Sequence, residues 1–169
     1  PGVMQKIDPI EGAKAEVIEY NPGFTPDNKY VEIMDIVKSV TDTVDIMDAK
    51  ILVSGGRGVG SAEKFKLLDD LAEVLGATVS CSRAVVDAGW KPKDLQVGQT
   101  GKTVAPKLYI ACGISGAIQH VAGMKESGIV ISINTDPDAP INKIADYVIL
   151  GSVEEVLPKM IKYYKENSK

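Results

Sequence analysis

The stretch Lys50-Ile51-Leu52-Val53-Ser54-Gly55-Gly56-Arg57-Gly58-Val59-Gly60-Ser61 decides the fold. It begins as an apolar strand with little alternation and continues as a glycine-rich turn. Residues 62–75 then place their apolar side chains at helical spacing, and Gly76 ends the predicted helix. A continuous apolar strand followed by a glycine turn and a helix is typical of a parallel sheet covered on both faces.

The same strand–turn–helix pattern continues toward the C-terminus. We predict further strands at residues 77–80, 107–111, 129–133 and 147–150, and helices at residues 117–125 and 153–164. Helical crossovers between parallel strands are right-handed. The predicted fold class is therefore α/β, with residues 49–169 forming a doubly wound, mostly parallel, Rossmann-like sheet that carries helices on both faces.

Residues 1–48 differ from the rest, and we interpret them as an N-terminal arm with extended strands. Apolar and polar residues nearly alternate at 15–20 and 31–36, on either side of a turn-rich loop at 21–28. A helix over residues 30–40 is an alternative. The arm is too short to bury a core of its own.

Composition limits the function classes. The chain of 169 residues suits one domain, and its hydrophobic (44%) and charged (25%) fractions are those of a soluble globular protein. A formal net charge of -4 argues against a nucleic-acid binder. No apolar run reaches the roughly 20 residues of a membrane helix. The N-terminus has no signal-peptide pattern and no initiator methionine, so we expect a fragment or the second half of a longer protein.

Cysteine and histidine are too scarce for a disulfide framework or a metal site. Cys81 and Cys112 lie in apolar, strand-like runs, and His120 is the single histidine. Two reduced core thiols are typical of a reducing compartment. We expect the cytoplasm of a prokaryote or the matrix of an organelle.

Polar, glycine-rich turns follow the predicted strands. In parallel sheets such turns meet at the carboxyl edge and bind ligands there. Arg57 can clamp a phosphate, with glycines that let backbone amides approach it. The dinucleotide fingerprint is broken, however, because Ser61 stands where its third glycine would fall and Ser82-Arg83 follows the next strand without an acidic residue.

Three other segments contribute candidates to the same edge. The loop 95–102 offers amides and a hydroxyl to a heteroaromatic edge, and residues 113–120 open a helix with glycines, Ser115 and His120. Asn134 follows another strand and could contact an adenine or ribose edge. A lone histidine is more often structural than catalytic, and no nucleophile–base–carboxylate set accompanies it. The segments together predict one long crevice.

These motifs occur in one order: Val53-Ser54-Gly55-Gly56-Arg57-Gly58, residues 82–90, residues 96–101, residues 113–120 and residues 134–137. The set closely resembles the C-terminal, FAD-binding half of electron-transfer flavoprotein α subunits, over roughly residues 49–165. The resemblance implies FAD as the cofactor and an electron carrier in which the flavin does the chemistry.

The resemblance also implies which residues bind FAD. They are Arg57, Ser82, Arg83, Gln96, Val97, Gly98, Gln99, Thr100, Ser115, Gly116, Ala117, Ile118, Gln119, His120 and Asn134. In the family, the arginine matching Arg83 lies against the isoalloxazine ring. The threonine matching Thr100 approaches N5, and the histidine matching His120 approaches the O2 side. A cation and donors there stabilise negative charge on the reduced ring.

The expected partners are an electron-transfer flavoprotein β subunit and flavin-dependent, acyl-CoA type dehydrogenases. A family subset instead splits electron pairs from NADH with a second flavin, and the residues do not decide between these modes. Two departures from the family stand out: Gly151-Ser152-Val153 lacks an aspartate expected on the adenosine side, and the α subunit's N-terminal domain is not in the chain.

Two other function classes remain open. One is the NAD(P)-binding domain of an oxidoreductase, in which Arg83 would accept a 2′-phosphate. The broken fingerprint counts against it. The other is a nucleotide sensor or assembly domain without redox function.

Overall fold

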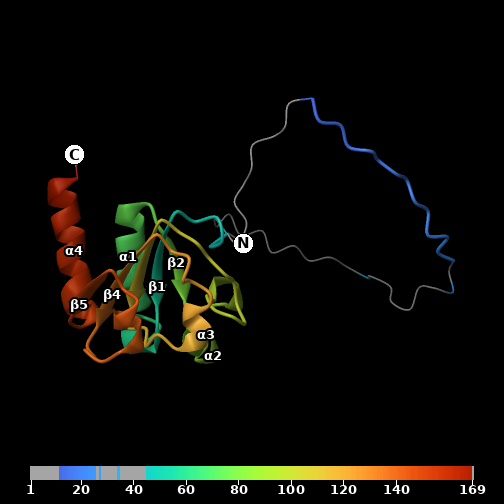
Figure 1. Ribbon diagram of the computed structural model, residues 1–169. Helices are drawn as coiled ribbons and strands as arrows, with labels where there is room; N and C mark the ends of the chain where they lie inside the picture. Colours follow the sequence, from blue (N-terminus) through green and yellow to red (C-terminus); the bar gives the residue numbers. More distant parts are fainter. Residues whose placement is uncertain (1–11, 26, 28–33, 35–44, 169) are drawn as a thin grey trace. The chain divides into compact units, whose positions relative to one another are not determined.

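The computed structural model describes residues 12–25, 27, 34 and 45–168 (Figure 1). The chain divides into two units, one at Gln5–Thr43 and one that holds residues 44–169. The larger unit contains all the helices and strands described below. Within the described residues, no helix is long and apolar enough to cross a membrane.

Within residues 45–168, five strands form one sheet in the order β2-β1-β3-β4-β5. The strands are β1 (Ile51–Gly55), β2 (Thr78–Cys81), β3 (Leu108–Cys112), β4 (Ile129–Asn134) and β5 (Tyr147–Leu150). Each pairing is parallel. The prediction of an α/β, Rossmann-like parallel sheet is confirmed, and the order is the flavodoxin-like one.

The two faces of the sheet are covered differently. Helices α1 (Phe65–Leu75) and α4 (Val153–Asn167) pack on one face, where their side chains bury Val53, Ile110 and Ile133 (Figure 1). The other face buries Leu52 and Tyr109 under irregular chain and short helices. The short helices of the unit are α2 (Arg83–Asp87), α3 (Ile118–Val121), η2 (Arg57–Val59), η3 (Lys93–Leu95) and η4 (Pro140–Lys143).

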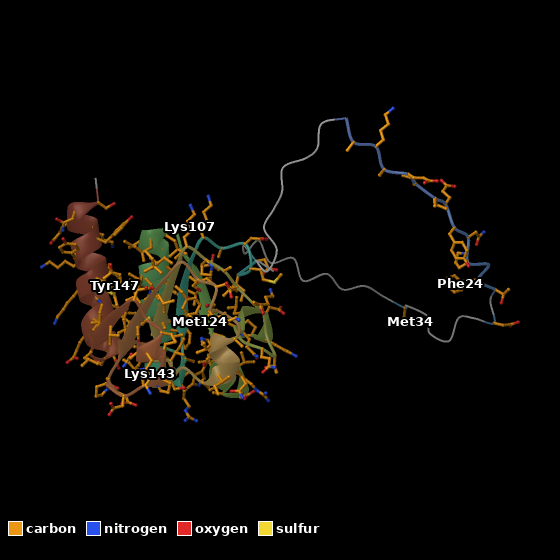
Figure 2. All side chains as sticks on the ribbon, in the orientation of Figure 1. Phe24, Met34, Lys107, Met124, Lys143 and Tyr147 are labelled. Atoms are coloured by element: carbon orange, nitrogen blue, oxygen red, sulfur yellow. The ribbon has the colours of Figure 1, made fainter. Side chains whose placement is uncertain are left out.

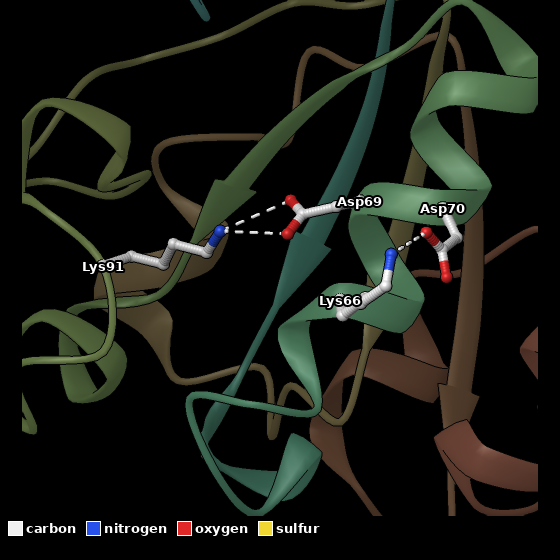
Figure 3. A network of polar contacts seen from close by, with 4 residues as sticks. All are labelled: Lys66, Asp69, Asp70 and Lys91. Carbon is white, nitrogen blue, oxygen red and sulfur yellow. Dashed lines mark hydrogen bonds and ion pairs between the residues drawn. The ribbon is translucent and has the colours of Figure 1, made fainter.

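Helix α1 presents an apolar stripe to the sheet and an ionic surface to solvent. Phe65, Leu68 and Leu71 are buried. Lys66 pairs with Asp70 one turn later at 2.7 Å, and Nζ of Lys91 lies 3.3 Å from both carboxylate oxygens of Asp69 (Figure 3). Such exposed pairs contribute little stability, so the apolar stripe fixes the helix.

Helix α4 begins with a capping box at the first of the two departures from the family pattern. The hydroxyl of Ser152 accepts from the amide of Glu155, and the Glu155 carboxylate accepts from the amide of Ser152. A cap of this kind typically stabilises a helix by about 1 kcal/mol. Ser152 therefore has a local structural role where the family pattern led us to expect an aspartate.

Two short helices of the structure differ from the prediction. The helix predicted at residues 117–125 is only Ile118–Val121, followed by turns, and helix α2 was not predicted. Both elements are shorter than the roughly 11 residues over which helical periodicity becomes readable. They lie next to the cavity described below.

The N-terminal arm is exposed over most of its described part, and Ile46 near its end is buried in the core. Residues 12–25 are exposed, and residues 15–20 are assigned neither strand nor helix. In the predicted turn at 21–28, Oδ1 of Asn21 accepts from the amide of Gly23 at 2.9 Å. Figure 2 shows the side chains of Phe24 and Met34, which are exposed. The segment 31–36, apart from Met34, lies outside the described residues, as does most of the alternative helix at 30–40.

Candidate cofactor-binding site

A cavity of about 700 Å³ opens at the carboxyl edge of the sheet. Its walls come from the turns that follow β1, β2, β3 and β4 and from the loop at residues 96–100. Because β1 lies between β2 and β3, the chain leaves β1 and β3 in opposite directions, and the cavity spans this switch point. The volume is within the range of small-molecule and cofactor sites.

The structure brings the predicted site residues together with two exceptions. All the residues predicted from the resemblance line the cavity except Gly116, which is buried beneath it, and Ile118, whose side chain is 83% exposed. Further lining residues are Gly56, Gly58, Ala84, Asp87, Gly113, Ile114, Asp136 and Ala139. Asp87 could have been found from the sequence, because it follows Arg83 by four residues, which is the spacing of an ion pair on a helix.

The glycines after β1 have a different role from the predicted one. The amides of Gly56 and Gly58 donate to the carbonyls of Cys112 and Gly113, at 2.8 and 3.0 Å, so they do not face a ligand. A Cβ atom on Gly56 would lie 2.2 Å from the Gly113 carbonyl oxygen. These glycines allow two turns to touch backbone to backbone, which shapes one wall of the cavity.

Asn134 also has protein partners. Its Nδ2 donates to the carbonyl of Ile114 at 2.9 Å, and its Oδ1 accepts from the amide of Asp136 at 3.1 Å. The side chain therefore joins the turn after β4 to the turn after β3. The predicted contact with an adenine or ribose edge remains a prediction, and it would use the remaining donor and acceptor capacity of the amide.

The loop 96–100 is fixed by hydrogen bonds at both ends. The amide of Val97 donates to Cys81 at 2.9 Å, and the amide of Gln99 donates to Gln119 at 2.7 Å. Nε2 of buried Gln96 donates to the hydroxyl of Thr100 at 3.0 Å. Such a loop presents its polar groups in one arrangement before any ligand binds.

Two guanidinium groups line the cavity. Arg57 and Arg83 are exposed, and Nε of Arg83 lies 3.4 Å from a carboxylate oxygen of Asp87. Arg57 makes no salt bridge with any described residue. Paired and unpaired guanidiniums on one wall suit a ligand that carries phosphate groups. No cluster of potential metal ligands occurs among the described residues.

His120 is buried beside the cavity and contacts the sheet. Its Nε2 lies 2.9 Å from the hydroxyl of Tyr109, and its Nδ1 is buried without a hydrogen bond of normal geometry. Burial lowers the pKa of His120 to about 4, and a weaker interaction with the backbone of Val97 acts in the opposite direction. The imidazole is therefore neutral at pH 7. Nε2 already has a protein partner in Tyr109. The predicted donation from His120 to a ligand stays a prediction.

The lowered pKa of His120 predicts a loss of stability in mild acid. Since the folded pKa is near 4 and the ordinary value is 6.5, the unfolded chain binds the proton more tightly. The contribution of His120 to the free energy of unfolding is complete above pH 6.5. It falls by on the order of 3 kcal/mol as the pH drops toward 4. Urea unfolding between pH 7 and pH 5 measures the first part of this loss.

Between pH 7 and pH 5, the loss of stability can be attributed to His120 and not to the carboxylates whose pKa values are lowered. The exposed carboxylates of Asp45 and Glu154, whose pKa values are lowered by hydrogen bonds from the Met47 amide and the Lys64 ammonium, titrate below this range. His120 is the single histidine, so its proton resonance can be followed without assignment. A titration midpoint above pH 6 would contradict the prediction.

Comparison with known proteins gives matches over this part of the chain. Residues 45–125 match the family model described as electron transfer flavoprotein FAD-binding domain. Protein FixB of Clostridium saccharobutylicum is 54% identical over 166 residues, which are 98% of this chain and 49% of that protein. The electron transfer flavoprotein subunit alpha of Thermoanaerobacterium thermosaccharolyticum is 49% identical over 166 residues, covering 98% of this chain and 50% of that protein.

A mitochondrial relative has a similar degree of identity. The mitochondrial electron transfer flavoprotein subunit alpha of Oryza sativa subsp. indica is 55% identical over 122 residues, which are 72% of this chain and 34% of that protein. The chain thus spans about half the length, or less, of these curated relatives. The similarity includes the turns after β1, β2 and β3, which supply most of the cavity wall.

Proposed function

We propose that this chain, whose residues 45–125 belong to the family of electron transfer flavoprotein FAD-binding domains, holds FAD in the cavity at the carboxyl edge of its sheet and relays electrons through it. The family establishes FAD as the cofactor. The relay function and the way this chain holds FAD are the proposal. The observation that carries it is the convergence of four strand-end turns, with two guanidiniums among them, on a single cavity.

The lining groups suit the parts of FAD. Among the described residues, Arg57 has no carboxylate partner, which leaves its guanidinium available for the pyrophosphate. Ser82 is the N-cap of α2, yet its hydroxyl makes no capping hydrogen bond and can donate to a ligand. The fixed loop 96–100 offers Gln99 and Thr100 as polar groups for a heteroaromatic edge.

The protein's contribution is binding, orientation and charge. FAD, when bound, supplies the redox chemistry by accepting and releasing electrons. Arg83 provides positive charge where the family places the isoalloxazine ring, and it favours the ring's reduced, negatively charged form. His120 is neutral at pH 7, so it adds no formal charge there. No residue of the cavity needs to exchange a proton with a substrate.

The relay needs proteins outside this chain. We propose an electron-transfer flavoprotein β subunit as the binding partner and flavin-dependent dehydrogenases of the acyl-CoA type as electron donors. Names among the relatives include both bacterial and mitochondrial subunits. The cytoplasm of a prokaryote or the matrix of an organelle is the compartment that fits this proposal.

FAD titration tests the proposal directly. We expect the full chain, freed of ligand, to quench the fluorescence of added FAD and to give the absorbance of a protein-bound isoalloxazine. NAD⁺ and NADP⁺ at the same concentrations should not compete. Binding of a nicotinamide nucleotide with no binding of FAD would overturn the proposal.

A further inference from the structure

The polar side chains buried behind the cavity gather around one tyrosine. The hydroxyl of Tyr109 lies 2.9 Å from Nε2 of His120, and both residues are buried. Three side-chain atoms are buried without a hydrogen bond of normal geometry among the described residues: Oγ of Ser54, Oγ of Ser80 and Nδ1 of His120. Unsatisfied buried polar atoms are rare enough in folded proteins that each calls for a reason.

Tyr109 keeps its proton and has it available for His120. Burial raises the pKa of Tyr109 above its usual range, so the phenol is protonated near neutral pH. The hydroxyls of Ser54 and Ser80, paired across β1 and β2, act on this pKa in the opposite direction. A phenol is a stronger donor than a neutral imidazole, and a bare imidazole nitrogen is a stronger acceptor than a phenol oxygen, so the phenol's hydrogen points toward Nε2.

The other side of the imidazole follows from this bond. A neutral ring that accepts at Nε2 carries its hydrogen on Nδ1. Nδ1 of His120 is buried without a hydrogen-bond partner among the described residues, and the backbone of Val97 favours the protonated form of the ring. The form of the imidazole is therefore set from the Tyr109 side.

We propose that Tyr109 is a positioning residue: its hydroxyl donates to Nε2 of His120, holds the imidazole in the Nδ1–H form, and thereby holds helix α3 and the loop 96–100 against the sheet. The loop is joined to this helix by the amide of Gln99, which donates to the carbonyl of Gln119 next to His120. His120 thereby links the core of the sheet to a wall of the cavity. The consequence for FAD affinity rests on the proposed function. The form of the imidazole does not.

Nitrogen NMR of the ligand-free full chain tests the imidazole form. Because the chain has one histidine, a two-bond proton–nitrogen correlation shows one pattern that needs no assignment. We expect a protonated Nδ1 and a bare Nε2 at pH 7, which is the less common form for a free imidazole. A wild-type spectrum with hydrogen on Nε2 would overturn the proposal without any variant.

Tyr109→Phe removes only the hydroxyl. We expect the Nε2–H form to become the major one in this variant, while Tyr163→Phe, which alters a tyrosine that is 71% exposed, leaves the spectrum unchanged. FAD affinity should weaken roughly two- to tenfold in Tyr109→Phe and not in Tyr163→Phe. A changed imidazole with unchanged affinity would overturn the link to the cavity. Wild-type protein that binds no FAD would overturn the proposed function and leave the NMR result standing.

Discussion

Replacing Gly113 by alanine is expected to lower the free energy of unfolding by about 2–4 kcal/mol and FAD affinity by at least tenfold. Gly113 follows β3 with φ +59°, in the left-handed region, and its Cβ would lie 2.6 Å from the carbonyl carbon of Gly58. The alanine therefore adds backbone strain to a collision with backbone, which cannot move as a side chain can. Separating the two turns opens one wall of the cavity. Urea unfolding and FAD titration measure the two effects.

Gly76→Ala is the matched control for backbone strain. Gly76 has φ +61° at the end of α1, and a Cβ there meets nothing within 4 Å. This variant should lose only about 1–2 kcal/mol of stability, and it should keep its FAD affinity because Gly76 lies away from the cavity. Equal losses in both variants would show that the contact between the turns after β1 and β3 contributes nothing.

The sequence predicts the sheet well because strands β1 to β4 are largely buried, while only the edge strand β5 is mostly exposed. Strands of Val, Ile and Leu flanked by glycine can be read without tertiary information, and all five predicted strands begin within one residue of the strands in the structure. The face opposite α1 and α4 could not be predicted in this way. It is covered by chain such as Val97 and Val104, whose burial depends on contacts far along the sequence.

The candidate site was predictable as a set of residues but not as a set of contacts. The motifs place the residues at one edge, since the carboxyl ends of parallel strands meet there. They do not show that Asn134 bonds to Ile114, or that Tyr109 approaches His120 across the sheet face. Tyr109 reads as an ordinary core residue of β3, and only the fold shows which polar groups surround it.

Loss of the Arg83 charge is expected to lower the midpoint potential of bound FAD. Arg83 lies on the cavity wall, and we propose that it faces the isoalloxazine ring, as the resemblance implies. The side chain is 66% exposed, so solvent weakens its field. Its effect on the reduced, negatively charged ring is then about 1–2 kcal/mol, or roughly 20–45 mV for a two-electron couple. We expect Arg83→Ala to shift the potential down by this amount, measured by dye-linked reductive titration.

Removing the charge of the neighbouring Asp87 is a second test, in which the midpoint potential is expected to change in the opposite direction. The Asp87 carboxylate lies 3.4 Å from Nε of Arg83 and lines the same cavity, so it offsets part of the arginine's charge. Asp87→Asn should therefore raise the potential, by less than Arg83→Ala lowers it, because the carboxylate is held on the arginine's helix. Lys66→Ala and Asp70→Asn make the same charge changes in an equally spaced pair on α1, away from the cavity (Figure 3). If these control variants shift the potential as much as the Arg83 and Asp87 variants do, net charge and not position determines it, and Arg83 has no specific role in setting the potential.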